Sequence, residues 1–204
     1  MSLFTIAAKG GPLMLVLLAV SVAVVFIVVE RFIKFNRALR NKDNFLAEVY
    51  GHLQSGSIET SIQFCETHPQ FPIAAIIAKT LAALELGQEE SRRAMETAAA
   101  KEVHRLERGL GLLSTFAAIA PLVGFLGTVI GMVDVFMKLE QIGTADIQFL
   151  AGGIWVALIT TIGGLTVGIF AILFYNYFVD RLEAVGQELG ESLDVFLATL
   201  RKFK

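Results

Sequence analysis

Three long stretches of the chain carry no charged residue, and they decide what it can fold into. They are Gly10–Val29, Gly109–Val133 and Ile147–Val179, and apolar residues predominate in all of them. An α-helix needs roughly 20 mostly apolar residues to cross the hydrocarbon core of a bilayer, so each stretch is long enough. The sequence therefore predicts an all-α integral membrane protein with three transmembrane helices.

Two other interpretations of these stretches have to be weighed. An apolar N-terminus is also typical of a cleaved signal peptide, and a long apolar helix can be buried in a soluble protein. Against the first, Lys9 is the only early cation, no small-residue cleavage site follows, and Glu30 and Arg31 lead directly into a basic amphipathic segment. Against the second, the other two stretches are too long and too free of charge. Three membrane spans remain the favoured interpretation.

Lysine and arginine flank the three stretches unevenly. They follow the first at Arg31, Lys34, Arg37, Arg40 and Lys42, precede the second at Lys101, Arg105 and Arg108, and follow the third at Arg181, Arg201, Lys202 and Lys204. The opposite ends have only Lys9 and Lys138. Because cytoplasmic loops are enriched in Lys and Arg, the N-terminus is expected outside and the C-terminus in the cytoplasm.

Residues 30–108 have the pattern of short helices and not of an independent catalytic domain. Glycine and proline divide the segment, at Gly51, Gly56, Pro69, Pro72 and Gly87. One helix is expected over Ile73–Leu86. From Gln88 onward, apolar residues recur at spacings of three and four, with no break signal before the second span. This predicts one continuous helix from Gln88 to Phe136.

The predicted map of the chain has seven parts. Residues 1–9 lie on the outer side of the membrane, 10–29 form the first transmembrane helix, 30–108 a cytoplasmic helical region, 109–136 the second transmembrane helix, 137–149 a loop on the outer side, 150–179 the third transmembrane helix, and 180–204 a cytoplasmic C-terminal helix that continues it. On the cytoplasmic helix, Glu89, Glu90 and Arg93 have helical pair spacings. A solvated surface is the favoured interpretation of these charges, and salt bridges between subunits are the alternative.

Composition excludes several other classes of function. The net charge is -2 and no basic stripe with interleaved aromatic residues is present, so nucleic acid is not an expected partner. Cys65 is the only cysteine, so no internal disulfide can form. Cys65 and His68 make a lone C-x-x-H pair, whereas a closed metal site usually needs four ligands. We expect no metal, no cofactor and no catalytic residue.

The second and third spans each carry a stripe of mainly small residues that includes a threonine hydroxyl. In the second span the stripe is Ala117, Pro121, Gly124, Thr128 and Gly131; in the third it is Ala157, Thr161, Gly164, Gly168, Ala171 and Tyr175. Both follow spacings of three and four, which put their members on one helix face. Small residues let membrane helices pack closely, so packing alone is one interpretation. The other is that the stripes line a cavity for another helix, water or an ion.

None of the three uncharged stretches, 10–29, 109–133 and 147–179, contains Asp, Glu, Lys, Arg or His. Proton relays across membranes normally use such side chains. If this chain takes part in proton movement, the group that titrates must come from another protein.

Two blocks of the second half are similar to a known family. They are APLVGFLGTVIGMVDVF at Ala120–Phe136 and GGIWVALITTIGGLTVGIFAILFYNYF at Gly152–Phe178. With them the chain resembles the proton-channel family of ExbB, TolQ and MotA, and ExbB and TolQ most. The first half matches more loosely, through Gly10–Met14 and the Glu30-Arg31 pair. Three spans with a large first cytoplasmic loop fit ExbB and TolQ, whereas MotA has four.

The resemblance implies an assembly in a bacterial inner membrane. Subunits of this kind form a homo-oligomeric bundle, a pentamer, around single-span partner helices of the ExbD or TolR type. The partner supplies an aspartate, and proton flow past it drives outer-membrane transport or envelope maintenance. By residue, Thr128 and Thr161 match the family hydroxyls near that aspartate, and Pro121 matches the family proline. The other stripe residues, Ala117, Gly124, Gly131, Ala157, Gly164, Gly168 and Tyr175, are expected to line the same ion pathway.

The chain departs from the family pattern at two positions. Val156 stands where ExbB and TolQ often have a glutamate, and Phe170 where a proline is common. The first departure bears on the choice between proton and sodium. Two functions stay in competition: an ion-driven motor subunit, and a non-conducting membrane scaffold that anchors a partner. A membrane enzyme is disfavoured, because no acid, base and nucleophile converge in the sequence.

Overall fold

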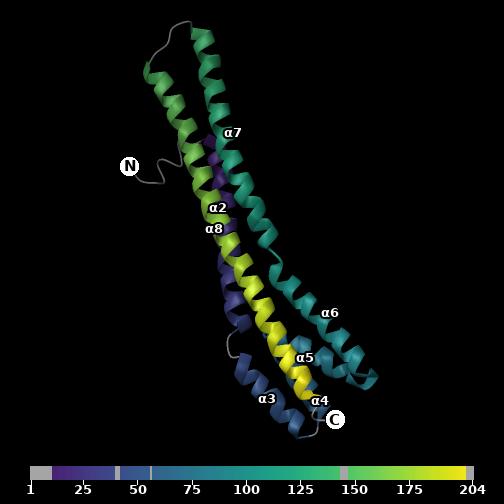
Figure 1. Ribbon diagram of the computed structural model, residues 1–204. Coiled ribbons are helices and arrows are strands. Elements are labelled where there is room, and N and C mark those ends of the chain that lie inside the picture. Colours follow the sequence, from purple (N-terminus) through teal and green to yellow (C-terminus); the bar gives the residue numbers. More distant parts are fainter. Residues whose placement is uncertain (1–10, 40–41, 56, 143–146, 201–204) are drawn as a thin grey trace. The chain divides into compact units, whose positions relative to one another are not determined.

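The computed structural model describes residues 11–39, 42–55, 57–142 and 147–200, and in these ranges the chain consists of helices joined by short turns, with no strand. The elements are α2 (Gly11–Leu39), α3 (Lys42–Gln54), α4 (Ile58–Glu66), α5 (Pro72–Ala82), the 3-10 helix η1 (Leu84–Leu86), α6 (Gln88–Glu107), α7 (Leu110–Ile142) and α8 (Ile147–Leu200) (Figure 1). The predicted N-terminal segment 1–9 lies outside the described residues. The chain divides into two compact units.

The first unit, called the apolar unit, comprises residues 11–29 and Gly109–Tyr177. It contains the start of α2, all of α7 and the first part of α8. Large apolar side chains cover its surface: Phe26 is 69% exposed, Leu122 64% and Ile162 63%. An apolar surface of this extent is suited to hydrocarbon rather than water. In the described part of the chain, three helices are long and apolar enough to cross a membrane.

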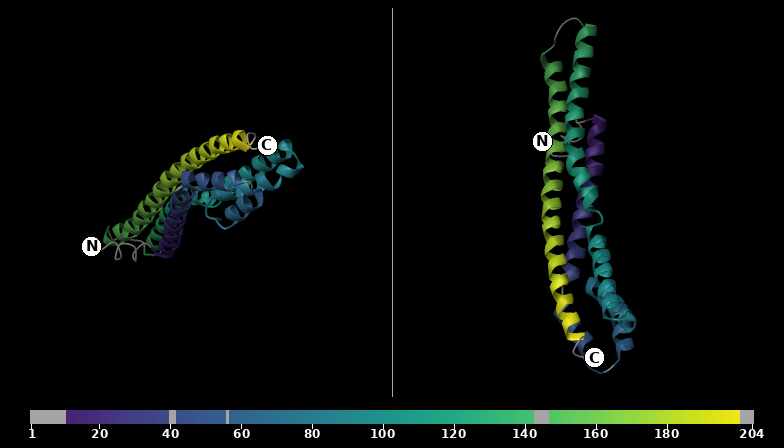
Figure 2. Two further views of the ribbon diagram at one scale, coloured as in Figure 1. Left: turned by 90° about the horizontal axis from the view of Figure 1, so that it is seen from below. Right: turned by 45° about the vertical axis from the view of Figure 1, so that its right-hand side comes forward.

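Within the apolar unit, α7 and α8 run side by side, and α2 packs beside them (Figures 1 and 2). The buried side chains are mainly small or aliphatic: Leu17, Val24, Ile27, Leu110, Leu113, Ala117, Ala120, Val135, Ala157, Ile159 and Ala171. On the α2 side, Met14 and Leu17 approach Gly163 of α8. The helical backbone satisfies its own hydrogen bonds, which the bilayer interior requires.

Helices α7 and α8 extend beyond the predicted limits of the spans. α7 continues to Ile142 and α8 begins at Ile147, so much of segment 137–149, predicted as a loop, is helical. α8 has 54 residues and contains no proline, since Phe170 occupies the position where the resemblance would place one. Proline in a helix interior removes a hydrogen bond and kinks the helix. α8 therefore runs without a break to Leu200.

The helix predicted from Gln88 to Phe136 is interrupted at Arg108 and Gly109. Arg108 has an extended ψ of 132° and Gly109 has a φ of 89°. A positive φ suits glycine, which has no Cβ to clash with the backbone. Glycine is also common inside membrane helices, so the sequence alone did not show whether Gly109 ends a helix or lies within one. The result is two helices, α6 and α7, in place of one.

The second unit, called the polar unit, comprises Glu30–Arg108 and residues 178–200. Helix α5 is its centre: Ile73, Ile76, Ile77 and Leu81 are at most 1% exposed. Pro72 stands at the start of α5, where a missing backbone N–H costs little. Gly87, with a φ of 119°, ends the turn after η1, so the segment predicted as one helix over Ile73–Leu86 is α5 followed by η1.

Polar and aromatic contacts hold the helices of the polar unit together. The Ser91 hydroxyl of α6 donates to the carbonyl of Thr80 in α5 at 2.8 Å. Phe35 stacks on Phe178 with ring centroids 5.6 Å apart, which joins α2 to α8. Arg31 is 3% exposed and its Nη1 donates to the carbonyl oxygen of Leu106 at 3.0 Å. This carbonyl lies in the last turn of α6, where the helix supplies no amide to bond it.

Candidate functional site

The two stripes of small residues meet at the contact between α7 and α8. A Cβ on Gly164 would lie 2.8 Å from the Cα of Gly124, and one on Gly124 would lie 2.9 Å from the Thr160 carbonyl oxygen. Real Cβ atoms essentially never come this close to backbone. The two helices therefore touch backbone to backbone, as small-residue motifs allow in membrane proteins.

Pro121 and Gly168 form a second close contact in the same interface. A Cβ on Gly168 would lie 2.8 Å from the Cδ of Pro121 and 3.2 Å from the carbonyl oxygen of Ala117. Pro121 has no N–H, so the Ala117 carbonyl lacks its usual helical donor. Because Gly168 packs against Pro121 and the Ala117 carbonyl, little room is left for water beside this carbonyl.

Thr160 completes the interface, and the sequence analysis did not single it out as a site residue. It is 1% exposed, its hydroxyl donates to the Ala157 carbonyl at 2.7 Å, and its side chain fills the space beside Gly127. The signal that could have found it is the Gly127-x-x-x-Gly131 motif, which requires a small partner on the opposite helix.

Thr128 and Thr161 are half-buried residues, one on each helix. Thr161 Oγ1 donates to the carbonyl oxygen of Gly124 across the interface at 2.9 Å. Thr128 Oγ1 donates to the carbonyl oxygen of Phe125 in its own helix at 2.6 Å. A hydroxyl has one proton to donate and two lone pairs to accept with. Both hydroxyls therefore keep an accepting capacity in these conformations.

The structure places the ten predicted pathway residues in two groups. Ala117, Gly124, Ala157, Gly164 and Gly168 are buried, and Pro121, Thr128, Gly131, Thr161 and Tyr175 are half-buried. The buried five take part in packing within a single subunit. The contact between α7 and α8 covers these five residues. Only the half-buried five keep surface that a partner protein could contact.

Charged groups are scarce around this interface. Asp134 and Lys138 form an exposed ion pair of 2.7 Å on α7, just past the end of the uncharged stretch. Val156, where the resemblance would place a glutamate, is half-buried on α8. Among the described residues, no group of three or more His, Cys, Asp or Glu could hold a metal ion. The interface offers hydroxyl and carbonyl oxygens in an apolar setting.

Comparison with known proteins identifies relatives of this arrangement. The model of the MotA/TolQ/ExbB proton channel family matches residues 69–191. The chain is 36% identical to the biopolymer transport protein ExbB-like 1 of Synechocystis sp., over 89% of this chain and 75% of that protein. It is 37% identical to the Tol-Pal system protein TolQ of Haemophilus influenzae, over 54% of this chain and 48% of that protein. It is also 37% identical to the biopolymer transport protein ExbB of Xanthomonas campestris, over 54% of this chain and 42% of that protein.

Proposed function

The chain belongs to the MotA/TolQ/ExbB proton channel family, and from this premise we propose that it is the conducting subunit of an ion-driven motor in a bacterial inner membrane. It is a multi-pass membrane protein of the ExbB and TolQ type, a family of membrane transport components rather than enzymes. The chain spans about half the length, or less, of the TolQ and ExbB relatives compared above, so the partner and the work performed are part of the proposal.

In the proposed assembly, five copies surround single-span helices of an ExbD or TolR type of protein. The partner contributes an aspartate at the level of the α7–α8 hydroxyls. The N-terminus is periplasmic, and the polar unit and the C-terminus are cytoplasmic. The lysines and arginines of residues 31–42 and 101–108 support this orientation, because positive residues favour the cytoplasmic side.

One observation carries the proposal. Thr128 and Thr161 are half-buried threonines, one in each stripe, and the two uncharged stretches that hold them contain no Asp, Glu, Lys, Arg or His. Each donates to a backbone carbonyl and retains lone pairs. A protonated carboxyl of the partner could donate a hydrogen bond to the hydroxyl oxygen of Thr128 or Thr161. An ionised carboxylate could accept a hydrogen bond from these hydroxyls only after they released their backbone carbonyls. The arrangement favours the neutral aspartate that must cross the apolar region.

The coupling proposed here needs no acid from this chain. The partner aspartate takes a proton from the periplasmic side, passes Thr128 and Thr161 in its neutral form, and releases the proton to the cytoplasm. Burying an ionised carboxylate in an apolar site costs far more than burying a neutral one. The movement of the partner helix that follows would energise outer-membrane transport or envelope maintenance.

Replacement of Thr161 by valine tests the proposal, since valine keeps the branched shape and loses the hydroxyl. Thr166→Val is the matched control: Thr166 is exposed on the same helix, and its hydroxyl donates to the Ile162 carbonyl at 2.7 Å. In vesicles holding this chain and its partner, proton uptake should fall in Thr161→Val and persist in Thr166→Val and Thr161→Ser. Equal uptake in all three variants, at equal protein levels, would remove Thr161 from the pathway.

A non-conducting scaffold is the second candidate function. The observation that favours it is the use of Ala117, Gly124, Ala157, Gly164 and Gly168 in packing within one subunit. A scaffold needs only such packing and an apolar surface for its partner. It would bind the partner equally well in Thr161→Val and would carry no ions.

A further inference from the structure

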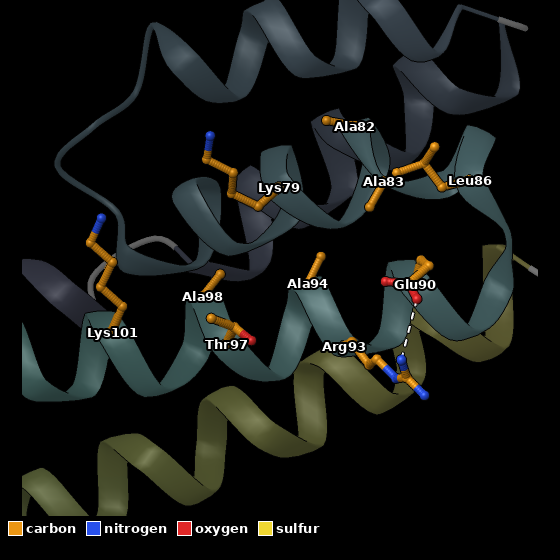
Figure 3. A pocket seen from close by; sticks show the side chains of 10 residues that line it. All are labelled: Lys79, Ala82, Ala83, Leu86, Glu90, Arg93, Ala94, Thr97, Ala98 and Lys101. Atoms are coloured by element: carbon orange, nitrogen blue, oxygen red, sulfur yellow. Dashed lines mark hydrogen bonds and ion pairs between the residues drawn. The ribbon is translucent and has the colours of Figure 1, made fainter.

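The polar unit has a groove of about 620 Å³ between α5 and α6. Alanines form its floor, with Ala82 and Ala83 on the α5 side and Ala94 and Ala98 on α6. Figure 3 shows Lys79 and Lys101 at one end of the groove, and Leu86 with Glu90 at the other. Short side chains on two neighbouring helices leave a channel that a third helix can enter.

At the ends of the groove, two lysines have no ion-pair partner among the described residues and one leucine is largely exposed. Lys79 and Lys101 are exposed, and neither forms an ion pair with any described residue. Glu90 is paired with Arg93 at 3.3 Å and so does not neutralise them. Leu86 is 77% exposed, the highest value among the large apolar residues of the polar unit. The groove is thus apolar in the middle, basic at one end and open to an apolar contact at the other.

The second part of α8 has complementary chemistry on its outer face. Residues 178–200 contain five acidic residues, Asp180, Glu183, Glu188, Glu191 and Asp194, and one basic residue, Arg181. The buried side of this helix is Val185, Leu189, Leu193 and Phe196. Glu191, Asp194 and Val195 lie on the opposite, exposed side, where Val195 is 61% exposed. Glycine and alanine, at Gly190 and Ala198, make this face narrow enough to enter a groove.

A chain's own α8 does not occupy its groove, because it packs on the other side of α6. Val103 lies 4.0 Å from a Cβ placed on Gly186 of α8. Val103 follows Ala94 by nine residues, which is two and a half turns of an α-helix, so the two side chains point in opposite directions. Figure 3 shows the same relationship, with α8 below α6 and the groove above it. α6 therefore separates its own α8 from the groove.

The groove and the outer face of α8 lie at the same height along the helix axes, so they can meet in a ring whose axis runs along these helices. α6 and α8 run antiparallel, and Val103 lies beside Gly186. Ala98 lies five residues before Val103, and Glu191 lies five residues after Gly186, so these two are at the same height. Ala94 and Val195 are matched in the same way, each nine residues from Val103 and Gly186 respectively. Rotation about an axis along these helices changes no residue's level. The α8 of a neighbouring copy would thus bring Val195 to Ala94, and Glu191 to Ala98 beside Lys101.

We propose that the α5–α6 groove of each copy binds the acidic outer face of α8 from the next copy around the ring. The contact is head-to-tail, which generates a closed ring when the rotation closes. Val195 covers the alanine floor, and Glu191 lies toward the lysine end. The inference deepens the proposed function, because it rests on the homo-oligomer and names the surface that joins its subunits.

Cysteine crosslinking in the assembled complex tests the contact. In a Cys65→Ala background, the pair Ala94→Cys with Val195→Cys should give a ladder of covalent multimers on a non-reducing gel. The control pair Val103→Cys with Gly186→Cys joins residues within one copy and should give none. A disulfide needs Cβ atoms about 3.5–4.5 Å apart, so the ladder reports a close contact. When copies carrying only Ala94→Cys are mixed with copies carrying only Val195→Cys, dimers alone should form.

A second test reverses the charges of Lys101 and Glu191 and measures the crosslinking rate. Lys101→Glu and Glu191→Lys should each lower the crosslinking rate of the Ala94–Val195 pair several-fold, and the double variant should restore it. If native mass spectrometry shows an oligomer but the pair gives no ladder, the docking proposal is overturned and the oligomeric channel stands. A disulfide confined to single chains would also overturn it. A monomer by native mass would contradict both proposals.

Discussion

The Thr161 hydroxyl of α8 donates a 2.9 Å hydrogen bond to the backbone carbonyl of Gly124 in α7. This bond is possible because Gly124 and Gly164 bring the two backbones into contact. The same interface thus provides both close helix packing and the hydroxyl of a half-buried threonine. The packing and the polar interpretation of the stripes therefore do not exclude each other. Substitutions can nevertheless separate them.

Replacing Gly164 by alanine should weaken the apolar unit. The added methyl group would meet the Cα of Gly124 at 2.8 Å, and backbone on both sides prevents an easy shift. Overpacking of this kind typically costs about 1–3 kcal/mol. Gly152→Ala is the matched control on the same helix, since a Cβ there meets nothing within 4 Å. Thermal unfolding in detergent should show a lower midpoint for Gly164→Ala only; an unchanged midpoint would mean that α7 and α8 are not in contact.

Cys65 should react very slowly with thiol reagents. It is 2% exposed, and burial, with a smaller effect of the Glu66 charge, raises the pKa of its thiol to about 12. The thiolate is the reactive form, and it is scarce at neutral pH. Because Cys65 is the only cysteine, maleimide labelling reports this site alone. Labelling should be slow in the native protein and fast in denaturant; fast labelling of native protein would contradict the buried position.

The same thiol makes stability depend on alkaline pH. Its pKa is about 12 in the folded chain, against the ordinary 9.0, so the unfolded chain ionises first as the pH rises. The contribution of Cys65 is complete below about pH 9 and is lost as the pH approaches 12, because the unfolded state then binds fewer protons. The free energy of unfolding should fall more steeply over this interval in the native chain than in Cys65→Ala. Parallel slopes would contradict the assignment.

Replacing Arg31 by alanine should loosen the end of α6. The guanidinium donates to the Leu106 carbonyl at 3.0 Å and is 3% exposed, so its loss leaves a carbonyl without a donor and a cavity beside it. Such a loss costs about 1–3 kcal/mol. Hydrogen exchange should accelerate in the last turn of α6. Arg37→Ala, at an exposed position of the same helix, is the control and should leave exchange unchanged; acceleration by both variants would argue against a specific role of Arg31.

The membrane spans were predictable because the absence of charge over 20 residues or more has few alternatives. The helical pairs of Glu89, Glu90 and Arg93 were predictable too, and they lie within α6 at 3.3–3.6 Å. Both patterns are local. In the single chain these charges pair within α6, and the choice between a solvated surface and salt bridges between subunits stays a prediction.

Features that depend on a distant neighbour were not predictable. Periodicity put Gly164 and Gly168 on one face, but it does not say whether that face meets α7 of the same copy or a partner. Arg31 and Leu106 are far apart in the sequence, so no local pattern announces their hydrogen bond. The break at Gly109 was missed for the opposite reason: glycine is common in membrane helices, and only its positive φ distinguishes a helix end.

The central claim is that this chain conducts protons only with a carboxyl borrowed from its partner. Proton uptake into vesicles at an imposed potential tests it most directly, with this chain alone, with its single-span partner, and with the partner's membrane aspartate replaced by asparagine. We predict uptake in the second sample only. Uptake by this chain alone, or undiminished uptake with the asparagine variant, would contradict the claim, and no uptake in any sample despite a full complex would favour the scaffold.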